Sequence, residues 1–83
     1  MNIQVFNLSL STEDRDLRRL FSAFGIVTSA EVVRDKLNGR SKCKAMIDMP
    51  INKEALLAIE SLHQTMLDGK TILVSEFHDK PKW

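Results

Sequence analysis

Two lysines and a methionine alternate with small or apolar residues in the stretch 40–49, which begins at Arg40. Successive side chains of an extended strand point to opposite faces, so Lys42, Lys44 and Met46 are expected to share one face. Cations can contact phosphates, and a thioether can supply an apolar contact. The other face, predicted to be core, carries Cys43, Ala45, Ile47 and Met49. The functional question is what the cationic face contacts.

The size and charge of the chain limit its function. With 83 residues it is predicted to be one small domain, in which a deep enzyme cleft is not expected. A net charge of +1 does not by itself indicate a nucleic-acid partner, so any electrostatic signal must be local. The single cysteine, Cys43, suits a reducing compartment. Because we find neither a membrane-spanning run nor the pattern of a signal peptide, we expect a cytoplasmic protein.

The sequence shows no arrangement of residues typical of catalysis. His63 and His78 are far apart, cysteine pairs are lacking, and no Gly-rich phosphate loop or nucleophile pattern occurs. We therefore expect no enzymatic activity and no bound metal or cofactor.

Hydrophobic periodicity predicts four strands and two helices. The strands are expected at 2–8, 27–34, 40–49 and 71–77, where β-branched and aromatic residues alternate with polar ones. Hydroxyl and acidic residues at 11–14 predict a helix start, and Gly25 is expected to end that helix in a left-handed conformation. Asn38-Gly39 predicts a tight hairpin with two positive φ angles, and Asp68-Gly69 predicts a second turn. The helical stripes are Leu17, Leu20, Phe21 and Phe24, then Ala55, Ala58, Ile59 and Leu62.

The order β-α-β-β-α-β predicts a ferredoxin-like α+β sandwich with a four-stranded antiparallel sheet. Right-handed crossovers in both βαβ units place the two helices on the same face of the sheet, so the opposite face is expected to be open. We expect residues 1–78 to form this domain and residues 79–83 to be a short flexible tail.

With this layout, several segments resemble the RNA recognition motif family, and the likeness extends over about residues 2–77. The segments are Ile-Gln-Val-Phe-Asn-Leu in the first strand, Leu-Arg-Arg-Leu-Phe-Ser-Ala-Phe-Gly in the first helix, Gly-Arg-Ser-Lys-Cys-Lys-Ala-Met-Ile-Asp-Met at the third strand, and Leu-Asp-Gly-Lys before the last. The compact form is similar to small bacterial members. The resemblance implies that single-stranded RNA lies across the open face, with bases stacked on aromatic side chains.

The aromatic positions of the family pattern are changed here. Its octamer aligns with residues 42–49, so the two stacking aromatics become Lys44 and Met46, while the basic first position remains as Lys42. The stacking position of the first strand aligns with Gln4. Because stacking contributes about 1 to 3 kcal/mol per base, the three changes remove on the order of 3 to 9 kcal/mol. We therefore expect weak or atypical RNA binding.

Two interpretations of the open face follow. In the first, single-stranded RNA is bound by Gln4, Phe6, Arg40, Lys42, Lys44 and Met46, with cations on phosphates and apolar groups on bases. In the second, RNA binding is lost and the apolar face contacts a protein partner or a second copy of the chain. The additional residues of that interface are Val33, Leu73, Phe77 and Trp83. In a variant of the second, the tail folds back and Trp83 covers Met46.

Overall fold

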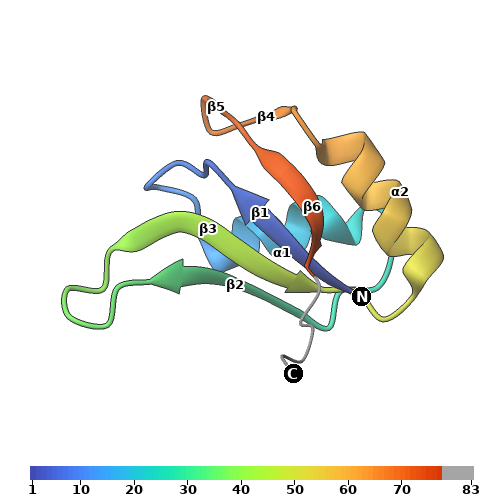
Figure 1. The fold of residues 1–83 in the computed structure, drawn as a ribbon, viewed down its shortest axis with the longest axis horizontal. Coiled ribbons are helices and arrows are strands. Elements are labelled where there is room, and N and C mark those ends of the chain that lie inside the picture. Colours follow the sequence, from blue (N-terminus) through green and yellow to red (C-terminus); the bar gives the residue numbers. More distant parts are fainter. Residues whose placement is uncertain (78–83) are drawn as a thin grey trace, which may run out of the picture.

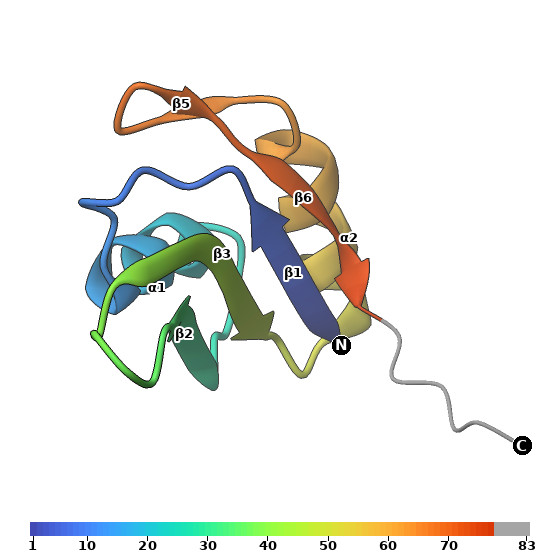
Figure 2. The same cartoon turned by 60° about the vertical axis from the view of Figure 1, so that its left-hand side comes forward.

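A computed structural model describes residues 1–77 of the chain, and its main elements follow the predicted order (Figure 1). The elements are β1 (Asn2–Phe6), α1 (Asp14–Ser22), β2 (Ser29–Arg34), β3 (Ser41–Asp48), α2 (Asn52–Leu62), β4 (Met66–Leu67), β5 (Lys70–Thr71) and β6 (Leu73–Phe77). The main sheet has the order β2-β3-β1-β6, and all neighbouring strands are antiparallel. Figure 2 shows both helices behind this sheet. The predicted ferredoxin-like fold is confirmed.

The hydrophobic core lies between the helices and one face of the sheet. Every second residue of the central strands is buried there, as the period of an extended chain requires. The residues from the strands are Ile3, Val5, Val32, Ala45, Ile47 and Val74, and those from the helices include Leu17, Phe21, Ala55 and Ala58. Burial of one large aliphatic side chain contributes about 1.5 to 3 kcal/mol, so this layer is the main source of stability.

The start of α1 differs from the prediction of a hydroxyl cap. The N-cap residue is Glu13, and its backbone N–H donates to Asp16 Oδ2 over 2.8 Å. Thr12 is only 1% exposed, so its hydroxyl needs a partner inside the protein. It donates to Asp68 Oδ2 over 2.7 Å and thereby connects the start of α1 to the turn between β4 and β5.

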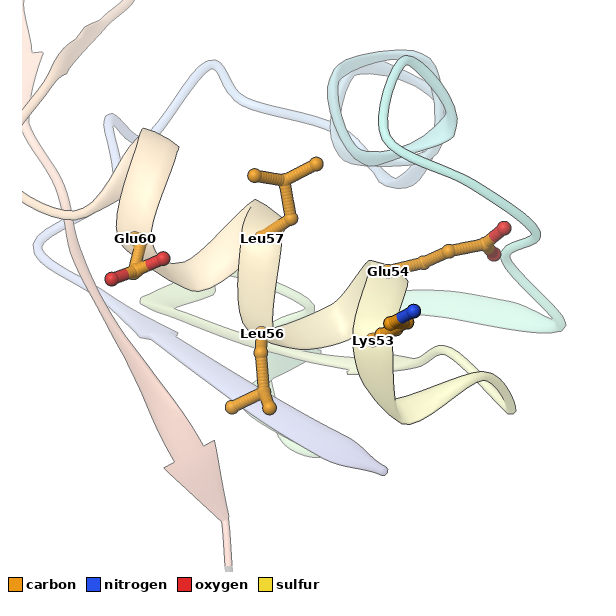
Figure 3. A pocket seen from close by; sticks show the side chains of 5 residues that line it. All are labelled: Lys53, Glu54, Leu56, Leu57 and Glu60. Carbon is orange, nitrogen blue, oxygen red and sulfur yellow. The ribbon is translucent and has the colours of Figure 1, made fainter.

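Gly25 does not serve as the left-handed cap that the sequence predicted. The C-cap residue of α1 is Ala23, which has an ordinary right-handed conformation with φ −64°. Gly25 instead allows α2 to approach closely, because a Cβ atom at this position would lie 2.6 Å from the Cβ of Glu54. The Glu54 carboxylate accepts a hydrogen bond of 2.9 Å from the backbone N–H of Ile26, and Figure 3 shows Glu54 extending from α2 toward this loop.

The predicted tight turn at Asn38-Gly39 is wrong. β2 and β3 are joined by a six-residue loop, 35–40, in which only Gly39 has a positive φ. The side chains of Asp35 and Asn38 accept the backbone N–H groups of Leu37 and Arg40, and such local side-chain bonds compete with a two-residue turn. A turn with two positive φ angles does occur between β4 and β5, at the Asp68-Gly69 pair that the sequence also marked as a turn.

A bulge interrupts the pairing of β3 with β2. Between the pairs Val32–Ala45 and Arg34–Ser41, one residue of β2 faces three residues of β3, 42–44. Cys43 lies at the centre of this bulge with φ 61°, and its carbonyl oxygen accepts the N–H of Leu8 over 2.9 Å. The strict alternation predicted from residue 40 therefore applies to the regular ladder with β1, which begins at position 44.

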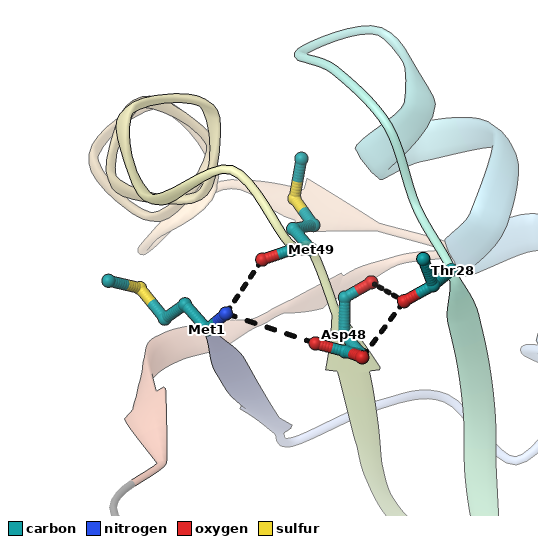
Figure 4. A network of polar contacts seen from close by, with 4 residues as sticks. All are labelled: Met1, Thr28, Asp48 and Met49. Atoms are coloured by element: carbon teal, nitrogen blue, oxygen red, sulfur yellow. Dashed lines mark hydrogen bonds and ion pairs between the residues drawn. The ribbon is translucent and has the colours of Figure 1, made fainter.

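Polar contacts connect three chain segments at the far end of the sheet (Figure 4). The Met1 ammonium donates to the carbonyl oxygen of Met49 over 2.7 Å and lies 3.8 Å from Asp48 Oδ1. The Thr28 hydroxyl lies 2.9 Å from Asp48 Oδ2, to which it can donate. The beginnings of β1 and β2 are thus held to the end of β3.

Two sequence predictions lie partly or wholly outside the described residues. The tail 79–83 and the contact of Trp83 with Met46 fall beyond residue 77, so both stay predictions. In the described part of the chain, neither helix has the length and apolar character that would let it cross a membrane.

Candidate nucleic-acid interface

The sheet face opposite the helices carries the residues that the alternation assigned to it, except Lys42, which lies in the bulge of β3 where the regular alternation is interrupted. All of them are at least partly exposed, which confirms that this surface is open within the described part of the chain. We define the open face by these residues: Gln4, Phe6, Glu31, Val33, Lys44, Met46, Asp48, Leu73, Ser75 and Phe77. They are available to a ligand because the structure covers none of them completely.

Four of the predicted RNA-binding residues surround one hollow of about 220 Å³ on this face. In the register of β1 and β3, Gln4 lies opposite Met46 and Phe6 lies opposite Lys44. Side chains opposite each other on one face of a sheet are direct neighbours. The other residues around the hollow are Val33, Ala45 and Phe77. The structure thus brings together an amide, an aromatic ring, a thioether and a cation.

The two remaining predicted RNA-binding residues lie outside this hollow. Arg40 is exposed in the loop 35–40, and Lys42 is exposed in the bulge of β3. Leu73 lies opposite Phe6 on β6 and is 41% exposed. Of the residues predicted for a protein interface, Val33 and Phe77 line the hollow, whereas Trp83 is outside the described residues.

Ser75 is a candidate site residue that sequence reasoning did not select. The Gln4 Nε2 donates to Ser75 Oγ over 3.1 Å, across the pairing of β1 with β6. This bond leaves the Gln4 Oε1 as an acceptor and the Ser75 hydroxyl proton as a donor for a ligand. The alternation of Ser75 with Leu73 and Phe77 along the strand was the sequence signal that placed Ser75 on this face. The pair gives the centre of the open face groups that can read a base edge.

Charges are distributed unevenly over the open face and the adjoining loop. Cations gather at the β2–β3 loop and the start of β3, and none of them forms an ion pair within residues 1–77. They are Arg34, Lys36, Arg40, Lys42 and Lys44. Glu31 lies opposite Met46, and Asp48 lies opposite Asn2, toward the other end of the sheet. A phosphate chain is therefore favoured on the loop side.

The surroundings of Cys43 and His63 indicate structural roles for both residues. Cys43 is half-buried in the bulge and forms no disulfide. The His63 Nδ1 accepts the backbone N–H of Val74 over 3.0 Å, at the end of α2. Within residues 1–77 no three His, Cys, Asp or Glu side chains are grouped as metal ligands would be.

Comparison with known proteins shows the family to which the chain belongs. Residues 3–73 match the RNA recognition motif, and the chain belongs to this family. It is 39% identical over 80 residues to the chloroplastic 29 kDa ribonucleoprotein B of Nicotiana sylvestris, a match that covers 96% of this chain and 28% of that protein. The chain spans less than a third of the length of the curated relatives it matches.

Solved structures agree with the family assignment. The crystal structure of RNA Binding Protein PG1 is 35% identical with a TM-score of 0.92, and the match covers 99% of both chains. The Sex-lethal protein/RNA complex is 27% identical with a TM-score of 0.91, covering 98% of this chain and 48% of that one. The Nicotiana sylvestris protein and the Scaffold attachment factor B2 of Homo sapiens, 39% and 35% identical to this chain, come from eukaryotes, so the likeness to small bacterial members stays a prediction.

Proposed function

We propose that this protein binds single-stranded RNA, with low affinity, over the open face of its sheet. Membership of the RNA recognition motif family supports this function, as does the likeness to the Sex-lethal protein/RNA complex. The observation that carries the proposal is the hollow where Gln4, Phe6, Lys44 and Met46 meet. It combines apolar contact, hydrogen-bonding capacity and positive charge on one accessible surface.

Each group has a role that its chemistry suits. Phe6 and Met46 provide apolar contact with a base, and Phe6 is 37% exposed. Gln4 hydrogen-bonds a base edge. Lys44 contacts the phosphate chain, which continues toward Arg40 and Lys42 at the loop. Affinity is low because three stacking positions carry no aromatic ring, a loss on the order of 3 to 9 kcal/mol.

Salt dependence of RNA binding tests the proposal. The affinity for a short random RNA is measured by fluorescence anisotropy over a range of salt concentrations. We expect Lys44→Ala and Lys42→Ala each to reduce the slope of log K against log salt by about 0.7, because each lysine releases a counterion from a single strand. Lys53→Ala, on α2 behind the sheet, is the matched control and should not change the slope. Salt-insensitive binding, or an equal effect of Lys53, contradicts the proposal.

The alternative function is a protein contact through the same face. The exposure of Phe6, Leu73 and Phe77, each 37 to 41%, favours it. A homodimer through this face would have a mass that rises with concentration, and Phe6→Ser would lower that mass. A protein that stays monomeric at high concentration, or whose self-association does not respond to Phe6→Ser, rules out this homodimer.

The extent of the domain and its location complete the proposal. We infer that residues 1–78 form the binding domain, that 79–83 is an accessory tail, and that the protein acts in the cytoplasm. The single cysteine supports a reducing compartment. Nothing in the binding role requires a cofactor or a catalytic step.

A further inference from the structure

The outer side of α2 carries a second stripe of residues that the core does not use. Lys53, Leu56, Leu57 and Glu60 follow at i, i+3, i+4 and i+7, on the side of the helix opposite the buried stripe. Leu56 and Leu57 are 50% and 51% exposed. Together with Glu54, these residues surround a shallow hollow of about 480 Å³, and Figure 3 shows the two leucines pointing to either side of the helix.

The two charges of this stripe have no partner within residues 1–77. Neither Lys53 nor Glu60 forms an ion pair there. They lie about 10.5 Å apart along the helix axis and form no ion pair with each other. A cation, two leucines and an anion are thus presented in a row along an exposed helix.

The order of these residues is self-complementary. The junction of Leu56 and Leu57 lies midway between Lys53 and Glu60 in the sequence. If two α2 helices lie antiparallel about a twofold axis through this junction, Lys53 of each copy faces Glu60 of the other. The leucines then face one another at the centre. Such an isologous contact uses the same patch on both copies, and both charge pairs are satisfied at once.

We propose that the outer face of α2 is a docking surface for a second copy of this chain, arranged antiparallel. The contact removes four leucine side chains from water and forms two symmetric ion pairs at its rim. Because the helices lie on the opposite side of the sheet from the open face, both sheets stay accessible in the dimer (Figure 2). A patch of one short helix is small, so the dimer is expected to be weak.

Charge exchange tests the arrangement. Sedimentation velocity is measured from micromolar to about millimolar protein for wild type, Lys53→Glu, Glu60→Lys, the double variant, and an equimolar mixture of the two single variants. Each single variant places like charges opposite each other twice, so we expect its dimer dissociation constant to rise about tenfold or more. The double variant and the mixture restore opposite charges at both positions. Both should associate as wild type does.

Leucine variants test the centre of the contact. We expect Leu57→Ser to abolish self-association, whereas Leu37→Ser, at a residue 97% exposed in the β2–β3 loop, should leave it unchanged. Circular dichroism checks that each variant is folded. A wild type that is monomeric at every concentration overturns the proposal. So does a dimer that ignores the charge variants but is lost in Phe6→Ser, since that dimer uses the open face. RNA binding by the monomer is measured separately, so either proposal can fail alone.

Discussion

Replacement of Gln4 by tyrosine should strengthen RNA binding. Gln4 occupies the position where the RNA recognition motif pattern has a stacking aromatic, and it lies opposite Met46 on β3 and Ser75 on β6. It is half-exposed at the hollow of the open face, so a ring at this position can lie flat beside Met46. A base stacked on that ring contributes about 1 to 3 kcal/mol, which corresponds to a dissociation constant about 5- to 150-fold lower.

The substitution also removes the hydrogen bond from Gln4 to Ser75. A neutral hydrogen bond of this kind contributes about 0.5 to 1.5 kcal/mol to folding. We therefore expect a modest loss of stability in urea denaturation alongside the gain in affinity. The two effects are separable because they are measured in different experiments.

Fluorescence anisotropy with a short random RNA at fixed salt measures the gain. Gln4→Leu is the matched control, because leucine has a volume similar to that of glutamine and has no π-face on which a base could stack. The reasoning is refuted if Gln4→Tyr binds no more tightly than wild type, or if Gln4→Leu gains as much. Either result would mean that bases do not stack at this position of the sheet.

Two further predictions concern the packing of α2. His63→Ala leaves the buried N–H of Val74 without its acceptor and should lower the free energy of unfolding by about 1 to 3 kcal/mol. His63→Asn keeps an acceptor and should lower it less. Equal losses for the two variants in urea denaturation would contradict this prediction. Gly25→Ala forces Glu54 aside and should lower the free energy of unfolding by about 2 to 4 kcal/mol. The added methyl group of Gly39→Ala meets no atom within 4 Å, so this variant should lose only about 1 kcal/mol through backbone strain. A smaller loss for Gly25→Ala than for Gly39→Ala would argue against the close contact with Glu54.

The fold was predictable because its signals are periodic. The alternation along β1 and the apolar stripes of both helices depend only on local spacing, and the handedness of the crossovers then places both helices on one side. The open face follows directly from this alternation. The neighbouring positions of Gln4 and Met46 also depend on the register of β1 with β3, which spacing alone does not give.

The differences between the predictions and the structure depend mainly on contacts between segments that are distant in sequence. Gly25 is required by Glu54 of α2, and Thr12 is buried against Asp68, neither of which spacing reveals. The bulge centred on Cys43 was missed because a non-glycine residue with positive φ has no signature in composition. Ser75 had the correct alternation, but its importance depends on the hydrogen bond with Gln4.

The loop 35–40 is held together by its own atoms. Its base is closed by the hydrogen bond from the Asp35 N–H to the carbonyl oxygen of Arg40, 2.8 Å, and Asp35 and Asn38 stabilise its interior. Leu37 at its tip is almost fully exposed. Because most of the hydrogen bonds that shape this loop are made within it, we expect insertions near Leu37 to have little effect on folding. The loop is therefore a suitable place to add residues or to change the charge when the ligand preference of the protein is redesigned.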